Sequence, residues 1–577
     1  MVASLKNESF EKELQNHINT LSKHSEKWAR SSIETRLRII KEIRSKLDGV
    51  AFDWVKKACE KKEIPVMSPL EGEEWISGPY AVMAALNGIS ETLSNMKNKN
   101  FLKSIPVRKT ITENISAKIV PNSIWDHLLL SGVSAEVWMQ KSVNFENLKE
   151  YTASAYDIPR DNREGKISLV LGAGNIAAIT PLDCFQKLFS EHKVVLLKLS
   201  PVNEYLEPFL LEALEPLINF GALKIIKGDK DVGQKLCNHP KIDDIHITGS
   251  RSTYNSVVWG SEKEAKKNIP LGKKLNKRPV SAELGAVCPT IVVPGPWSKS
   301  DIKFQAAQVA TMKLHNAGFN CVACQVLIIP SNWAISDKFL KAIGDAIISA
   351  PSRGLYYPGA ASRLKEFRNK GKNILTFQRK DSDPCFIEAL GKEGDSWFEN
   401  NEIFAPAMST FKIDFVSPEE YLKSAVDYSN EKLEGTLGAN IIIHPKTIRE
   451  IGEIKFEKII SKLKYGTIAI NAWTGLGFLM PQCPWGAFPG HKPDDIQSGT
   501  GFVHNTYMFD KVERCVVRAP FRPFPRNLFS FKFTLLPKPP WFVNNTRQKI
   551  IGRLLTRFQY KPSILKLPRI FLNALIG

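Results

Sequence analysis

Between about residue 166 and residue 300, short apolar runs alternate with longer helical stretches, and this alternation limits the possible folds more than any other feature. The short runs are rich in β-branched residues and lie at 167–170, 176–180, 194–199, 223–226 and 245–248. Helix-like stretches, such as residues 207–220, separate them. Strands interleaved with helices form βαβ units around a mainly parallel sheet. The region therefore predicts an α/β domain.

A second alternation follows from about residue 290 to residue 480, with expected strands at 290–293, 323–329 and 467–471. Two consecutive α/β domains fit this pattern. Upstream, residues 10–63 have the apolar spacing of amphipathic helices, and residues 101–150 suggest strands or a hairpin arm. Past residue 520 proline recurs, so that part of the chain is not expected to join a regular sheet.

A glycine-containing segment follows the first expected strand. Gly172-Ala-Gly174-Asn-Ile-Ala177 matches a loose dinucleotide-binding fingerprint with Ala at its last position. Such a fingerprint should lead into a helix. Here it runs into residues 176–180, which we expect to be a strand that ends at Pro181. The pattern therefore does not favour the usual phosphate-loop interpretation.

Thr248-Gly249-Ser250 ends another expected strand where a helix can begin. Free amide groups and a hydroxyl at a helix N-terminus suit a pyrophosphate. An ordinary serine N-cap explains the same residues equally well. The segment becomes informative only together with the motifs that follow it.

Three further motifs follow in order. They are Ser281-Ala-Glu283-Leu-Gly285, Asn316-Ala-Gly318-Phe-Asn-Cys321 and Glu402-Ile-Phe404-Ala-Pro406. In this order and at these distances, the set resembles the signatures of the aldehyde dehydrogenase superfamily, over roughly residues 20–515. The resemblance implies two parallel-sheet α/β domains, a Rossmann-like cofactor domain and a catalytic domain, together with an oligomerisation arm.

The resemblance also assigns roles to single residues. Cys321 corresponds to the nucleophile, Glu283 to the general base and Asp183 to the position of an oxyanion-binding side chain. The cofactor NAD or NADP would be held by Thr180, Lys198, Gly228, Gly249, Ser250, Glu402 and Phe404. Lys198 and Glu402 would bind the two riboses, and Gly249 and Ser250 would face the pyrophosphate.

These residue types suit the oxidation of an aldehyde to a carboxylate. A cysteine thiolate adds to the carbonyl and forms a thiohemiacetal. Hydride loss leaves a thioester, which water hydrolyses when a nearby carboxylate acts as a general base. The alternatives are an acylating or reductive variant that acts on an acyl thioester, and a cofactor-binding relative with little activity.

Asp183 departs from the resemblance, because relatives carry Asn in the run Pro-x-Asn-x-Pro, whereas this chain reads Thr180-Pro181-Leu-Asp183. An ionised carboxylate there would repel developing negative charge, and losing one oxyanion donor typically costs about 10²–10³ in kcat. A buried, protonated Asp could still donate. The same comparison replaces Lys-Pro-x-Glu by Lys198-Leu-Ser-Pro201, which removes an acidic residue and makes NADP plausible.

The net charge of +20 is concentrated near the C-terminus, where thirteen Lys and Arg and no Asp or Glu lie between Arg514 and Gly577. Since no nucleic-acid-binding motif accompanies this charge, we expect no nucleic-acid partner. Residues 547–558 predict a short basic amphipathic helix. It could lie on an anionic membrane surface, but packing along the body of the protein is the favoured interpretation.

The expected domain map has four parts. Residues 1–282 form N-terminal helices and the cofactor domain, with arm strands within about 105–172. Residues 283–470 form the catalytic thiol domain, residues 471–520 return to the cofactor domain and arm, and residues 521–577 form a basic hydrophobic extension. By resemblance we expect a homodimer or homotetramer acting on a small aldehyde.

The expected compartment is the cytoplasm, with membrane association as an alternative. The charged N-terminus lacks the apolar stretch of a secretory signal. The nine cysteines are an odd number at irregular spacing, which favours reduced thiols over a disulfide framework. Cys324 forms a Cys-x-x-Cys pair with Cys321, but no second pair or His cluster completes a zinc site, so no metal is expected.

Overall fold

The structure, a computed structural model of the chain, describes residues 2–530 and 534–577. Two sheets organise it. The smaller has six strands in the order β17-β8-β7-β4-β5-β6. Its strands are β4 (Ile167–Leu171), β5 (Val194–Lys198), β6 (Leu223–Ile226), β7 (Asp244–Gly249), β8 (Val280–Leu284) and β17 (Gly499–Thr500). All neighbours pair in parallel except β17 and β8, so the predicted parallel α/β sheet is confirmed.

The expected strand at 176–180 is wrong. Helix α6 (Ile179–Phe185) begins there, and all its residues are buried. A helix buried on every side has no polar face, so its apolar run cannot be told from a buried strand by periodicity. Pro181 lies in the first turn of α6, where a missing N–H leaves no hydrogen bond unmade. The glycine-containing loop therefore does lead into a helix.

The larger sheet has eleven strands in the order β1-β2-β3-β19-β15-β14-β9-β10-β13-β12-β11. Its strands are β1 (Val107–Lys109), β2 (Ile115–Val120), β3 (Ser134–Met139), β9 (Pro289–Val292), β10 (Val326–Pro330), β11 (Ile374–Arg379), β12 (Ser382–Ala389), β13 (Ala407–Ile413), β14 (Gly438–Ile442), β15 (Thr467–Ile470) and β19 (Val512–Arg518). The strands from β19 to β12 pair in parallel.

The arm strands belong to this larger sheet. β19 pairs in parallel with β15 and antiparallel with β3, so β1, β2 and β3 continue the catalytic sheet of the same chain. The chain passes from the smaller sheet to the larger one between β8 and β9, and returns through β17. β16 (Trp485–Gly486) and β18 (Phe502–Val503) form a small separate pair.

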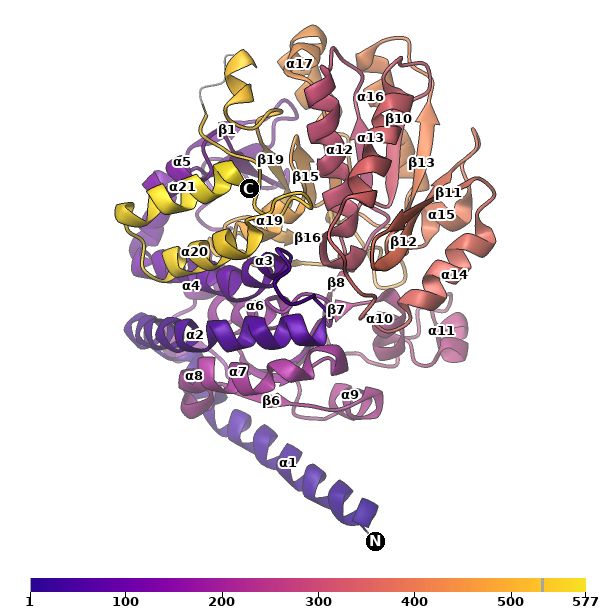
Figure 1. Cartoon of the computed structure of the whole chain (residues 1–577). Coiled ribbons are helices and arrows are strands. Elements are labelled where there is room, and N and C mark those ends of the chain that lie inside the picture. Colours follow the sequence, from indigo (N-terminus) through magenta and orange to yellow (C-terminus); the bar gives the residue numbers. More distant parts are fainter. Residues whose placement is uncertain (1, 531–533) are drawn as a thin grey trace.

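Helices cover both sheets (Figure 1). Those associated with the N-terminal half are α1 (Val2–Ala29), α2 (Ile33–Lys61), α3 (Glu71–Trp75), α4 (Ala81–Ser94), α5 (Ile124–Leu129), α6, α7 (Glu207–Ala213), α8 (Glu215–Phe220), α9 (Lys230–Cys237), α10 (Arg251–Val258) and α11 (Glu262–Asn268). Those of the second half are α12 (Lys299–Leu314), α13 (Ser336–Ile348), α14 (Ala360–Lys370), α15 (Ser396–Asn400), α16 (Pro418–Lys432), α17 (Pro445–Ile451), α18 (Glu453–Ile460) and α19 (Gly475–Leu479). The predicted apolar spacing in α2 is confirmed, since Ile39, Ile40, Ile43 and Leu47 are buried.

The C-terminal extension folds along the body. Its two helices, α20 (Gln548–Tyr560) and α21 (Leu567–Ile576), pack together, and α20 lies against α3 and α4 (Figure 1). Lys549 Nζ pairs with Glu71 at 2.8 Å. The basic amphipathic helix therefore turns its apolar side inward, as the favoured interpretation predicted. Among residues 2–530 and 534–577, no helix has both the length and the apolar character that a membrane crossing requires.

Candidate active site

Cys321 lies on a tight loop that follows α12. The loop begins at the end of that helix, and Asn316, Ala317 and Gly318 take positive φ angles of 52°, 53° and 81°. Asn tolerates this left-handed backbone better than most residues, and Gly accepts it without strain. A Cβ on Gly318 would also lie 2.7 Å from the Ala405 carbonyl oxygen. The motif Asn-x-Gly-x-x-Cys is thus the sequence that this loop requires.

Asn316 is the anchor of the loop. Its side-chain amide donates to the carbonyl oxygens of Asn175 and Phe319, both at 3.1 Å. Its Oδ1 accepts from Arg353 and from the Tyr356 hydroxyl, both at 2.9 Å. Every hydrogen-bonding atom of this side chain is therefore used, and the loop is held from several directions.

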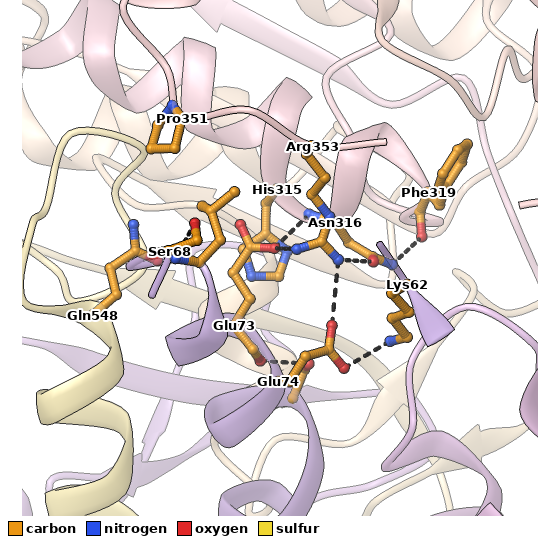
Figure 2. Close-up of polar contacts among 12 residues, drawn as sticks. Lys62, Ser68, Glu73, Glu74, His315, Asn316, Phe319, Pro351, Arg353 and Gln548 are labelled. Carbon is orange, nitrogen blue, oxygen red and sulfur yellow. Dashed lines mark hydrogen bonds and ion pairs between the residues drawn. The ribbon is translucent and has the colours of Figure 1, made fainter. Parts of the chain in front are cut away.

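A buried network of four charges supports Asn316 (Figure 2). Arg353 pairs with Glu73 at 2.6 Å and with Glu74 at 3.3 Å, and Lys62 pairs with Glu74 at 2.8 Å. All four side chains are at most 2% exposed. Glu73 also accepts from the Asn316 backbone N–H at 3.1 Å. We call Lys62, Glu73, Glu74 and Arg353 the charged network.

A second loop meets the Cys321 loop. It follows β4, and its Asn175 donates from Nδ2 to the Phe319 carbonyl at 3.1 Å. The Asn175 carbonyl in turn accepts from Lys62 Nζ at 3.1 Å. The charged network thus holds the loop after β4 as well as the loop that carries Cys321.

Glu283 and Cys321, the predicted base and nucleophile, lie close enough to influence each other's protonation. Glu283 lies near the end of β8, and its carboxyl group interacts with the Cys321 thiol. Trp485 Nε1 donates to Glu283 Oε1 at 3.2 Å and fixes the carboxyl group from the other side. Burial and the nearby Asp183 charge raise the pKa of Glu283 to about 8. A carboxyl with such a pKa is suited to proton transfer near neutral pH.

The Cys321 thiol is neutral in the resting site. Burial, followed by the neighbouring Glu283 and Glu402, raises its pKa well above the usual thiol value. A thiolate therefore forms only when a base removes the proton, and the Glu283 carboxyl is an acid–base group that interacts with this thiol.

Asp183 has a different environment from the one expected. It lies inside α6, accepts from Thr248 Oγ1 at 2.7 Å, and has His246 Nε2 at 3.6 Å and His504 Nε2 at 3.5 Å. Burial alone would raise its pKa, but His246 and His504 hold the pKa of this carboxyl well below its usual range. Asp183 is therefore an ionised acceptor, which contradicts the alternative that a protonated Asp183 donates to an oxyanion.

Known proteins resemble this chain in sequence. The sequence profile of the aldehyde dehydrogenase family matches residues 194–352. A putative aldehyde dehydrogenase of Gibberella fujikuroi, FUS7, is 25% identical over 384 residues, which cover 60% of this chain and 71% of that protein. Aldehyde dehydrogenase family 3 member F1 of Arabidopsis thaliana is 22% identical over 356 residues, which cover 59% of this chain and 66% of the plant protein.

Solved structures show the same fold. An NAD-dependent aldehyde dehydrogenase from Sinorhizobium meliloti superposes with a TM-score of 0.57 at 16% identity, covering 89% of this chain and 88% of that one. The glyceraldehyde-3-phosphate dehydrogenase GapN of Methanocaldococcus jannaschii, complexed with NADP, gives 0.57 at 15% identity, covering 88% and 94%. The chain thus resembles the aldehyde dehydrogenase family in sequence over residues 194–352 and shares the fold of these solved structures over most of its length. The fold class that the sequence predicted is confirmed.

Most of the predicted cofactor residues follow parallel strands. Lys198 ends β5, Gly228 follows β6, and Gly249 ends β7, all at the carboxyl edge where α/β sheets bind ligands. Ser250 is the N-cap of α10 and accepts from the Thr253 N–H. Thr180 differs, because it is fully buried and its hydroxyl faces the Ala173 carbonyl at 3.5 Å.

Glu402 and Phe404 lie on the catalytic side of the same region. The Glu402 carboxylate reaches over Gly285, where a Cβ would lie 2.1 Å from it, so the glycine leaves room for this acid. Burial raises the pKa of Glu402 to about 8. Glu402 Oε1 is buried and has no hydrogen-bond partner within the described residues. Phe404, at φ 46°, packs against the rings of Phe319 and Tyr357.

Three functional candidates escaped the sequence reasoning. Asn175 belongs to the weak glycine fingerprint, in the loop that follows β4. Glu204 lies six residues past Lys198, and its Oε1 accepts from the Gly228 N–H at 3.3 Å. Arg353 belongs to no motif. In the described part of the chain no group of His, Cys, Asp and Glu could hold a metal ion.

Proposed function

We propose that this protein oxidises an aldehyde to a carboxylate with NAD(P)⁺, using Cys321 as the nucleophile and Glu283 as the general base. The interaction between the Cys321 thiol and the Glu283 carboxyl group, both buried at the same place, is the observation that carries this proposal. It joins a nucleophile and its base within a site where Trp485 fixes the base.

Glu283 would act twice. In its ionised form it takes the thiol proton while Cys321 Sγ forms a bond to the aldehyde carbon. When bound, NAD(P)⁺ would supply the hydride acceptor, which leaves the substrate as a thioester on Cys321, and Glu283 would release the thiol proton to solvent before its second role. Glu283 then removes a proton from water, the water oxygen bonds to the acyl carbon, and the C–S bond breaks with the sulfur leaving as thiolate.

Asn175 is the better candidate for the oxyanion donor. Like the Asn of relatives, it lies in the loop that follows a strand, and its side chain reaches the residue two positions before Cys321. Nδ2 has two N–H groups, of which the Phe319 carbonyl uses one. The Cys321 main-chain amide would supply a second donor.

The cofactor site fits NAD(P) through Glu402, Ser250 and Lys198. Glu402 has a buried oxygen without a partner among the described residues, as expected of a group that awaits a ribose hydroxyl. Glu204 supplies the acidic group that seemed to be missing beside Lys198, since it interacts with both that ammonium and the Gly228 amide. A carboxylate there repels a 2′-phosphate, so we propose a preference for NAD over NADP.

The decisive experiment measures NAD(P)H absorbance with aldehydes of several lengths and both cofactors. Cys321→Ala should abolish turnover, and Asn175→Ala should lower kcat by about 10²–10³. Cys321→Ala also serves as the matched control for background oxidation. Turnover that persists in Cys321→Ala would overturn the thiol mechanism.

Adding coenzyme A to the same assay tests the acylating alternative. If Glu283 activates water, the rate and the carboxylate product should be independent of coenzyme A. If turnover appears only with coenzyme A, the acyl group leaves Cys321 to a thiol, and the proposed role of Glu283 in hydrolysis is wrong.

Two further proposals concern partners. A homodimer or homotetramer would have to form through surfaces other than the pairing of β3 with β19, because these strands are already paired within the chain. Peripheral membrane contact would use α21 rather than α20. The outer face of α21 exposes Leu572, Leu575 and Ile576, and no acidic residue accompanies the basic residues of the extension.

A further inference from the structure

An apolar cavity of about 160 Å³ lies between the C-terminal extension and the catalytic region. One wall comes from α12 and from the segment that contains Trp473 and Leu476. The opposite wall is the extension, including Trp541, Ile551, Ile570 and Ala574. The two helices of the extension therefore enclose a space as well as covering the body.

The irregular part of the extension is well suited to line such a space. Five of the lining residues between 520 and 540 are prolines: Pro520, Pro523, Pro537, Pro539 and Pro540. Proline has no backbone N–H. A chain without regular structure can therefore border an apolar cavity here without burying unpaired donors. The lack of a backbone N–H therefore explains why proline recurs in this part of the sequence.

Most polar groups around the cavity are already paired inside the protein. Thr311 Oγ1 donates to the Ala307 carbonyl at 2.7 Å and accepts from the Val543 N–H at 3.0 Å. Asn471 Oδ1 accepts from the Ile443 N–H at 2.8 Å. Gln308 is an exception, because its Nε2 has no partner within the described residues. A ligand rich in hydroxyls or charges would leave most of its groups unpaired in this cavity.

Trp473 connects one wall of the cavity with the loop that carries Cys321. Trp473 lines the cavity, and its indole N–H donates to the carbonyl of Val322 at 2.9 Å. Val322 is the residue directly after Cys321. Trp473, Val322 and Cys321 belong to one apolar cluster, which also contains Trp541 of the extension. Apolar packing therefore continues from the thiol to the cavity.

We propose that the cavity receives the hydrocarbon chain of a long-chain aliphatic aldehyde whose carbonyl carbon is attacked by Cys321. This inference rests on the proposed aldehyde oxidation at Cys321. An apolar cavity of about 150 Å³ binds benzene, so this cavity has room for about six carbons beyond those that span Trp473. Each methylene transferred from water into it strengthens binding about fourfold.

The test compares the kcat/KM values of a straight-chain series from propanal to hexadecanal. In the wild type, kcat/KM should rise with chain length by on the order of a thousandfold before it levels off. Ala574→Trp places a large side chain in the cavity, so it should remove most of this rise and leave propanal within about twofold. Leu575→Trp is the matched control, because Leu575 lies on the same helix and is 51% exposed.

Ile570→Ala keeps the proposal falsifiable if Ala574→Trp disturbs α21. It enlarges the cavity, and the preferred chain should become longer. A chain-length profile that is flat in the wild type, or unchanged in both cavity variants while turnover continues, would overturn the inference and leave the aldehyde oxidation standing.

Binding of cis-parinaric acid, whose fluorescence rises in apolar surroundings, separates the two proposals. If every aldehyde is silent, the proposed function fails. Probe binding by the wild type that Ala574→Trp abolishes and Leu575→Trp retains would still support an apolar-chain site. Equal binding by all three proteins, or no binding, would overturn that site.

Discussion

Two contrasting regions lie on either side of the loop that carries Cys321. On one side lies the charged network, which consists of Lys62, Glu73, Glu74 and Arg353. This network holds Asn316 in place through hydrogen bonds. On the other side an apolar cavity meets the loop through Trp473. The charged network fixes the backbone, since ion pairs and hydrogen bonds have narrow geometry, whereas the cavity leaves a volume with few directional contacts.

His315 separates the two regions. Its ring lies 5.1 Å from that of Trp473, and burial lowers its pKa. Because it is neutral, the His315 imidazole can pack against the Trp473 indole on one side and lie next to the charged network on the other. A single loop thereby combines rigid placement of the nucleophile with room for substrate, and the two properties can be changed separately.

The largest effect is expected from breaking the charged network. Arg353→Met leaves Glu73 and Glu74 partly uncompensated, and removing one partner of a buried pair costs about 3–5 kcal/mol of unfolding free energy. Urea unfolding measures this loss, and turnover should fall as the Asn316 loop loses its support.

A neutral version of the network is the control for Arg353→Met. Lys62→Met, Glu73→Gln and Glu74→Gln combined with Arg353→Met remove all four charges and should recover much of the lost stability, without restoring turnover. On the cavity side, Ile570→Ala should cost about 2 kcal/mol. If Arg353→Met and Ile570→Ala lowered the unfolding free energy equally, the two regions would not differ in the way described.

An intermediate effect is expected on pH dependence. Deacylation should speed up as pH rises through about 8, because Glu283 acts as a base only when ionised and its pKa is raised to about 8. Asp183→Asn removes one of the two causes of this raised pKa, so the profile should move to lower pH by roughly one unit.

Single-turnover rates across a pH series measure that shift. Glu283→Gln is the control and should remove the dependence altogether. An unmoved profile in Asp183→Asn would show that burial alone sets the pKa of Glu283.

The smallest effect is expected on the outer face of α21. Leu572 is 59% exposed, so Leu572→Ser should change the unfolding free energy by no more than about 0.5 kcal/mol. If α21 contacts membranes, the same change should weaken sedimentation with anionic vesicles, and vesicles of neutral lipid serve as the control. Identical sedimentation of wild type and Leu572→Ser would exclude this face as the contact.

Much of the fold could be predicted because strand and helix patterns alternate regularly. Strands β4, β5, β6 and β7 of the smaller sheet were predicted, whereas β8 and β17 were not. The strand expected at residues 176–180 was wrong, because a fully buried helix has no periodicity to detect. The start of β10 was also misplaced, since Ala323 belongs to the turn after Cys321 and the strand begins at Val326. The pattern of apolar residues along the sequence does not show where a turn ends and a strand begins.

The site was predictable where chemistry and backbone geometry coincide in one motif. Asn316, Gly318 and Cys321 share a loop that only a few residue types can form, so its sequence is distinctive. Arg353 could not be found, because its partners Glu73 and Glu74 lie about 280 residues earlier in the chain. Asn175 was overlooked because the sequence was aligned on Pro181, which lies in a helix rather than in the loop.

The pairing of β3 with β19 has a consequence for how the chain folds. Ser134–Met139 meets Val512–Arg518, so an interior strand pair of the larger sheet joins segments that lie far apart in the sequence. During synthesis one edge of the hairpin of β2 and β3 stays unpaired until almost the whole chain has emerged. Pairings this distant form slowly and leave aggregation-prone edges exposed meanwhile. Completion of the larger sheet therefore belongs to the last stage of folding.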